Sequence, residues 1–178
     1  MRILIVAAVA AFLAAPAFAA DAKMTLTGDN TKITFVGTKP DGKHEGGFKT
    51  LTGTATVAGD DLTTLKIELE IDMDSTFTDN EKLTGHLKSP DFFSVKANPK
   101  SKFVTTKVAK ADKGFTVTGD LTLNGKTKSV SFPAAISVAD GTLKLTSDFS
   151  IDRNDWGITY GKGKVGDEVA LKLAVEAK

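Results

Sequence analysis

The residues best suited to specific chemistry gather in one short stretch, SIDRNDWGITYGKGK, residues 150–164. It holds Arg153, one of two arginines in the chain, together with the single tryptophan, Trp156, and the single tyrosine, Tyr160. An arginine side chain offers a planar fork of donors that suits a carboxylate or the polar head of a ligand. The first question is therefore which anion or dipole Arg153 meets.

The other reactive side chains form no recognised catalytic or metal-binding motif. The chain has no cysteine, and its two histidines, His44 and His86, lie in no G-x-S-x-G nucleophile motif. A zinc site needs three or four ligands at characteristic spacings, and GKGK at 161–164 lacks the context of a phosphate-binding loop. We expect no catalytic residue, metal or cofactor. A hydrolase that uses His44 or His86 is a less favoured alternative.

The N-terminal segment has the pattern of a secretory signal peptide. Arg2 precedes an apolar run from Ile3 to Ala15, and residues 17–19 form a small-x-small cleavage pattern. We expect cleavage after residue 19, a single domain over residues 20–178, and a periplasmic or secreted protein. Without cysteine we expect no lipoprotein anchor. The near-neutral charge disfavours nucleic acid, and the apolar run is too short for integral membrane insertion.

Alternation of apolar and polar residues dominates the rest of the chain and predicts half-buried strands. In LKIELEIDM, residues 65–73, every second residue is apolar, and Asn124-Gly125 and Asp140-Gly141 suit tight hairpin turns. We expect an all-β fold of about eight antiparallel strands that closes into a barrel. One segment breaks the alternation. Thr78 and Glu81 there resemble a capping box and predict a short helix over 79–88 near one barrel end.

The interior of such a barrel is wide enough for packed side chains or for one small ligand. Its inward positions are aliphatic or Phe, with small residues such as Gly53 and Gly119 among them. These small residues either leave an apolar space for a hydrocarbon chain or fit the taper of a solid core that acts through its surface. If Phe92 and Phe93 are extended, only one of them points inward. The candidate cavity-lining residues are Phe35, Phe48, Ile67, Leu69, Ile71, Leu83, Leu87, Phe92, Phe93, Phe103, Phe115, Val117, Leu121, Phe132, Ile136, Phe149, Ile151 and Leu171.

Three segments carry a family likeness. GHLKSPDFFSVKANPKSKF, residues 85–103, resembles the central signature of the YceI-like family of exported lipid-binding proteins. TGDLTLNGKTKSVSF, residues 118–132, resembles its hairpin motif, and FSIDRNDWGI, residues 149–158, its Phe-x-Ile-x-Arg-x-Asp-aromatic-Gly segment. Thr84 and Trp156 depart from the usual acidic residue and Phe of the family. The resemblance implies an extended, lipocalin-like barrel whose cavity holds a long isoprenoid, such as a polyprenyl chain or quinone tail, or a similar lipid.

Four polar or amphipathic residues are candidates for the mouth of that cavity. Arg153 either meets a lipid head group or pairs with Asp155 or another carboxylate, since a buried unpaired arginine is costly. Trp156 either shields the cavity mouth or plugs one end of the barrel. His86 either faces the cavity or caps a strand end. The protein would then bind a lipid without chemistry, for transport, storage or sequestration, and a homodimer is left open.

Overall fold

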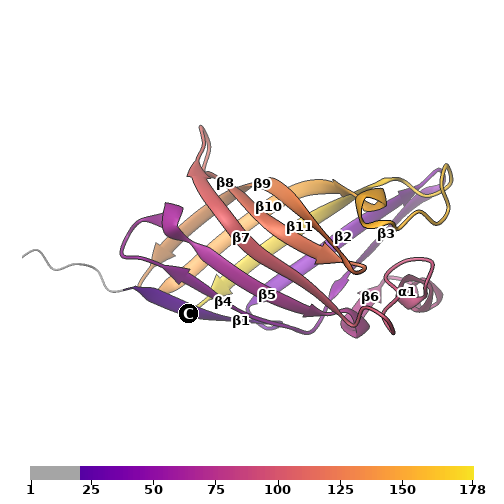
Figure 1. The fold of residues 1–178 in the computed structure, drawn as a ribbon, viewed down its shortest axis with the longest axis horizontal. Helices are drawn as coiled ribbons and strands as arrows, with labels where there is room; N and C mark the ends of the chain where they lie inside the picture. Colours follow the sequence, from indigo (N-terminus) through magenta and orange to yellow (C-terminus); the bar gives the residue numbers. More distant parts are fainter. Residues whose placement is uncertain (1–20) are drawn as a thin grey trace, which may run out of the picture.

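The structure is a computed structural model that describes residues 21–178, so the predicted signal peptide, 1–19, lies outside the described residues. The chain forms an elongated, curled antiparallel sheet with one short α-helix near one end (Figure 1). In the described part, no helix is long and apolar enough to cross a bilayer. The strands are β1 (Ala22–Thr27), β2 (Thr31–Lys39), β3 (Gly42–Phe48), β4 (Leu51–Val57), β5 (Lys66–Asp72), β6 (Thr76–Thr78), β7 (Lys100–Lys110), β8 (Phe115–Leu123), β9 (Lys126–Ala139), β10 (Thr142–Asp152) and β11 (Glu168–Ala177). The helices are α1 (Glu81–Lys88) and the 3-10 turns η1 (Leu62–Thr64), η2 (Met73–Ser75) and η3 (Arg153–Trp156).

The antiparallel all-β fold is confirmed, but the predicted count of eight strands is too low. Eight strands lie where the alternation places them, and β1, β3 and β6 are additional. β3, GKHEGGF, is rich in glycine and has only Phe48 as a large apolar residue, so it shows no alternation. β6 has three residues and is too short for a periodic signal.

The sheet curls so that its two ends are joined by the chain. The hydrogen-bonded order is β1-β4-β5-β7-β8-β9-β10-β11-β2-β3-β6, which leaves β1 and β6 as the edges. The chain crosses this seam at the β1–β2 turn, at the β3–β4 turn and at η2. At the first crossing the side-chain amide of Asn30 donates to the Thr25 carbonyl at 2.9 Å, and the Glu176 N–H donates to the Asn30 carbonyl at 2.8 Å. These bonds tie the first strand of the described chain to the last one.

β9 pairs with a different neighbour in each half. Residues 126–134 pair with β8, and residues 135–139 pair with β10. Pro133 lies where β9 leaves β10, a place where its missing N–H costs no ladder hydrogen bond. From Ser147 onward β10 pairs with β11 alone, so β9 and β10 part toward the end of the barrel that carries α1.

Trp156 fills the place where β9 and β10 part. The side chain is 1% exposed and belongs to a hydrophobic cluster against which Val130 of β9 and Ile151 of β10 pack. Its indole N–H donates to the Leu121 carbonyl at 3.0 Å, and the Asn124 side chain donates to the Trp156 carbonyl at 3.2 Å. Trp156 therefore acts as a plug in the side of the barrel.

α1 starts two residues later than predicted. Its N-cap is Asn80, whose side-chain oxygen accepts from the Leu83 N–H at 3.0 Å. The predicted cap, Thr78, lies in β6 instead, and its hydroxyl is 2.9 Å from the Thr84 hydroxyl. The Thr78–Thr84 contact holds the first turn of α1 against the edge of the sheet.

Arg153 is buried and has hydrogen-bond partners on all sides. The residue is 4% exposed. Its Nε donates to the Gly166 carbonyl at 2.9 Å, and its Nη1 donates to the Ile158 and Tyr160 carbonyls at 2.7 and 2.8 Å. Its Nη2 donates to the Val165 carbonyl at 3.2 Å. We call these four acceptors the carbonyl cage.

Arg153 was expected to meet a lipid head group or to pair with Asp155 or another carboxylate, and the structure shows another carboxylate, that of Asp167. Asp155 is exposed, and the carboxylate near the guanidinium is that of Asp167, at 3.4 Å from Nη2. The prediction that Arg153 points inward is confirmed. Most of the hydrogen bonds of its guanidinium, however, go to backbone carbonyls.

We predict that Arg153→Met lowers the free energy of unfolding by at least about 3 kcal/mol, since several buried carbonyls lose a charged donor. Chemical denaturation with two independent probes measures the change. Lys144→Met is the control, because Lys144 is exposed and its 3.0 Å contact with Glu176 lies on the surface. Its effect should be below about 1 kcal/mol. Equal effects of the two substitutions would contradict a structural role for the cage.

Candidate functional site

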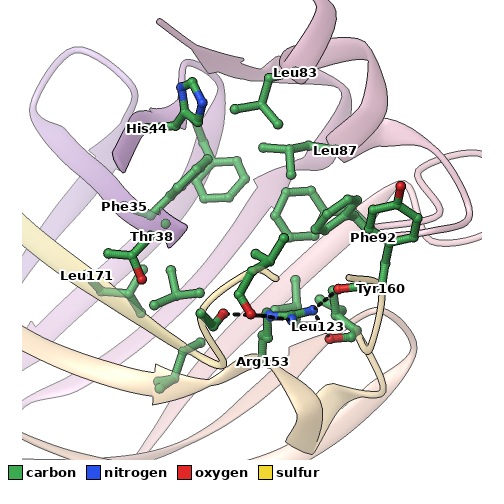
Figure 2. A pocket seen from close by; sticks show the side chains of 18 of the residues that line it. Phe35, Thr38, His44, Leu83, Leu87, Phe92, Leu123, Arg153, Tyr160 and Leu171 are labelled. Carbon is green, nitrogen blue, oxygen red and sulfur yellow. Dashed lines mark hydrogen bonds between the residues drawn. The ribbon is translucent and has the colours of Figure 1, made fainter. Parts of the chain in front are cut away.

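A cavity of about 360 Å³ lies inside the barrel at the end that carries α1. Figure 2 shows Leu83 and Leu87 on one side of it and Arg153 and Leu171 on the other. Cavities that bind small organic ligands measure roughly 300–1,000 Å³, whereas one water molecule takes only about 30 Å³ of liquid. The alternative of a solid core throughout the barrel is therefore wrong for this end.

Ten of the predicted apolar residues line the cavity. They come from strands on both sides of the barrel, from α1 and from the turn that follows α1. Six strands, β2, β3, β5, β8, β10 and β11, contribute one of them each. These residues are Phe35, Phe48, Ile71, Leu83, Leu87, Phe92, Phe93, Leu121, Ile151 and Leu171.

Phe92 and Phe93 both line the cavity, contrary to the expectation that only one would. They lie in a turn rather than in an extended segment, so adjacent side chains are not forced to opposite faces. The Phe92 N–H donates to the Ser89 carbonyl at 3.1 Å, and the Phe93 N–H donates to the Leu87 carbonyl at 3.0 Å. These bonds wrap the turn back onto the end of α1.

Aromatic rings form much of the wall on the β2–β3 side. The ring centroids of Phe35 and Phe48 are 5.7 Å apart, and those of Phe48 and Phe93 are 6.2 Å apart. Phe35 packs directly on the backbone of β3 at Gly46, where an added Cβ would lie 2.5 Å from its Cζ. The glycines that weaken the strand pattern of β3 thus make room for a cavity-lining ring.

Eight of the predicted lining residues do not reach the cavity. They pack with the larger hydrophobic cluster, whose members outside the cavity lining lie mainly in the half of the barrel away from α1. Side chains of this size meet across a narrow barrel and leave no space. These eight residues are Ile67, Leu69, Phe103, Phe115, Val117, Phe132, Ile136 and Phe149.

The four predicted polar or amphipathic residues do not all lie at the cavity. His86 and Arg153 line the cavity. Asp155 is exposed, and Trp156 lies in the wall rather than on the cavity surface. The N–H groups of Arg153 point at protein carbonyls, so Arg153 shapes the cavity without offering it a free donor.

Several residues of the cavity were not among the predicted site residues. Some lie on predicted strands and follow the inward register, so their alternation was a usable signal. The others lie in the β10–β11 connection or at the ends of β2 and β3, where no periodicity marks them. The unpredicted residues are Ile33, Gly37, Thr38, Lys39, His44, Ser101, Leu123, Ile158, Tyr160, Val165, Gly166 and Val169.

Both histidines are paired with aspartates at the rim. The His86 Nε2 lies 2.9 Å from an Asp91 carboxylate oxygen, and the His44 Nδ1 lies 3.0 Å from an Asp79 oxygen. The hydrogen bond with His44 lowers the pKa of the Asp79 carboxyl. The His86 ring also packs edge-on against Phe92 and Tyr160, at centroid distances of 5.0 and 4.8 Å.

These two pairs do not extend into catalytic triads. Within residues 21–178, no serine or threonine hydroxyl is hydrogen-bonded to either histidine ring. A Ser-His-Asp mechanism requires a nucleophile hydroxyl within reach of the imidazole. The geometry gives the hydrolase alternative no support.

Comparison with known proteins identifies relatives of the whole domain. The family model for the YceI-like domain matches residues 24–177. A UPF0312 protein of Serratia proteamaculans is 32% identical over 138 residues, which cover 74% of this chain and 71% of the relative. Among solved structures, BcnA of Burkholderia cenocepacia superposes with a TM-score of 0.76 at 24% identity, covering 83% of this chain and 96% of that one. A polyisoprenoid-binding domain from Saccharophagus degradans gives a TM-score of 0.69 at 14% identity, covering 88% and 98%.

The two structural likenesses show the shared fold. The family model spans nearly all of the described residues, and the resemblance of the sequence segments is confirmed. The chain belongs to the YceI-like domain family.

Proposed function

We propose that this protein binds a lipid with a long apolar tail, of the isoprenoid type, and holds it in the barrel cavity for transport, storage or sequestration. The observation that carries the proposal is an apolar cavity of about 360 Å³ lined by the strands and α1. A polar ligand would lose its hydrogen bonds to water on entering such a space and would find few new partners there.

The energetics of tail burial support this proposal. Each CH₂ group transferred from water to an apolar site contributes about 0.8 kcal/mol. Three polar side chains of the site stand at the rim: Tyr160 is 46% exposed, and His44 and His86 are partly exposed. A ligand would therefore place its tail inside and its head among these rim residues. The structural neighbour from Saccharophagus degradans, a polyisoprenoid-binding domain, supports the same class of ligand.

We predict that protein purified without detergent carries a lipid with a long apolar tail. Extraction of the folded protein with organic solvent, followed by mass spectrometry, identifies it. Protein that has been delipidated should take up added polyprenyl lipid. Repeated recovery of empty protein, together with no uptake of added lipid, would refute the proposal.

A matched pair of substitutions on β11 tests the location of the site. Leu171 lines the cavity, whereas Val175 lies on the same face of β11 in the packed half of the barrel. We predict that Leu171→Asn weakens lipid binding by at least about tenfold, because it brings a polar group into the apolar wall. Val175→Asn should lower stability without a comparable loss of affinity. Equilibrium displacement of a fluorescent lipid measures the affinities. A cavity that is not the binding site would leave the affinity unchanged in Leu171→Asn.

The proposal includes a location outside the cytoplasm, in the periplasm or secreted. It is supported by the apolar run and the small-x-small pattern of residues 1–19. We predict that the mature protein from a bacterial host begins at Ala20, as intact-mass measurement or N-terminal sequencing would establish. Recovery of the protein from the cytoplasm with Met1 still present would contradict this part of the proposal.

A further inference from the structure

The cavity extends along only part of the strands that line it. On β7 its deepest residue is Ser101, on β8 Leu121 and on β10 Ile151. The next residue on the same face of β7 is Phe103, and the next one on β10 is Phe149. Neither of these lines the cavity. On these two strands the cavity therefore ends against a layer of phenylalanine side chains.

Three phenylalanines make up this layer, which we call the aromatic floor: Phe103, Phe132 and Phe149. The centroids of Phe103 and Phe132 are 5.8 Å apart, and the rings of Phe132 and Phe149 stack at 4.4 Å with an angle of 13° between their planes. Aromatic contacts of this kind hold their geometry more firmly than aliphatic packing of the same area. The rings form a continuous row from β7 to β10.

The backbone beneath the floor fixes it in place. Phe103 packs on β8 at Gly119, where an added Cβ would lie 2.4 Å from its Cζ and 2.6 Å from the Val104 carbonyl oxygen. Gly119 is one of the small inward residues for which the sequence left open an apolar space. The Phe103 ring fills that space. Val117, which pairs with Phe132 across the sheet, and Leu145 and Ala55 beyond the floor are at most 2% exposed. A tail that reaches the floor meets a packed core.

We infer that the aromatic floor limits the length of the lipid tail, so that the protein selects ligands whose buried tail fills only the α1 half of the barrel. This inference rests on the proposed function and names the determinant of its specificity. With about 360 Å³ available, the cavity lies near the lower end of the range for ligand sites. Isoprene units added beyond the point where a tail meets the floor remain in water and add no affinity.

A homologous series of linear polyprenyl alcohols, lengthened one isoprene unit at a time, tests the inference. Displacement of a fluorescent prenyl probe from the delipidated protein gives Kd for each member. For the unmodified protein, each added unit should lower Kd by at least about tenfold until the tail reaches the floor. For longer alcohols Kd should no longer change, and we call this range of tail lengths the level region. In Phe103→Ala the level region should begin at a tail at least one isoprene unit longer.

Two further variants separate a floor effect from a loss of stability. Phe149→Leu is a milder change in the same layer and should also move the level region to longer tails. Phe115→Ala removes a phenylalanine that packs with the core at the start of β8, away from the cavity, and should leave the level region where it is. The stability of each variant is measured in parallel.

The outcomes distinguish the two proposals. If no alcohol of any length displaces the probe, the proposed lipid-binding function fails. If alcohols bind and affinity rises to the longest member, or if neither floor variant moves the level region, lipid binding stands and the floor inference is overturned.

Discussion

The structure depends on the burial of one guanidinium. Arg153 lies at the end of β10 with 4% exposure, and a charged group in that position must be surrounded by acceptors. The four carbonyls that accept its hydrogen bonds belong to Ile158, Tyr160, Val165 and Gly166, and all four of these residues also line the cavity. The same hydrogen bonds therefore solvate the buried charge, hold the β10–β11 connection in place and form one wall of the cavity.

This arrangement accounts for the rare residues in the stretch 150–164. Arg153 organises the connection, Trp156 fills the place where β9 and β10 part, and Tyr160 stands at the rim beside His86. A lysine at 153 could not reach four carbonyls at once, since it lacks the planar fork of donors. The residues of this stretch that are best suited to specific chemistry serve mainly to build the wall of the cavity.

The part of the molecule governed by strand periodicity could be predicted from the sequence. Alternation located eight strands, and the register of β10 correctly turned Arg153 inward. The partners of Arg153 could not be predicted, because the segment 157–167 has no period and its course is set by the guanidinium itself. The extent of the cavity could not be predicted either. Phe103 and Phe35 have the same type and the same inward register, yet one closes the cavity and the other lines it. Phe103 closes the cavity because its ring contacts Phe132, whereas Phe35 lines the cavity and contacts Phe48. Such contacts between rings on different strands cannot be read from the sequence.

The pairing of β2 with β11 has a consequence for how the chain folds. β2 follows close on the start of the described chain and β11 ends it, yet residues 31–36 pair with residues 170–175. Contacts between segments so distant in sequence form late, since a long loop must close first. The barrel cannot be completed while the C-terminal strand is still missing from a growing chain. A polypeptide with this topology stays incompletely folded until β11 has been synthesised.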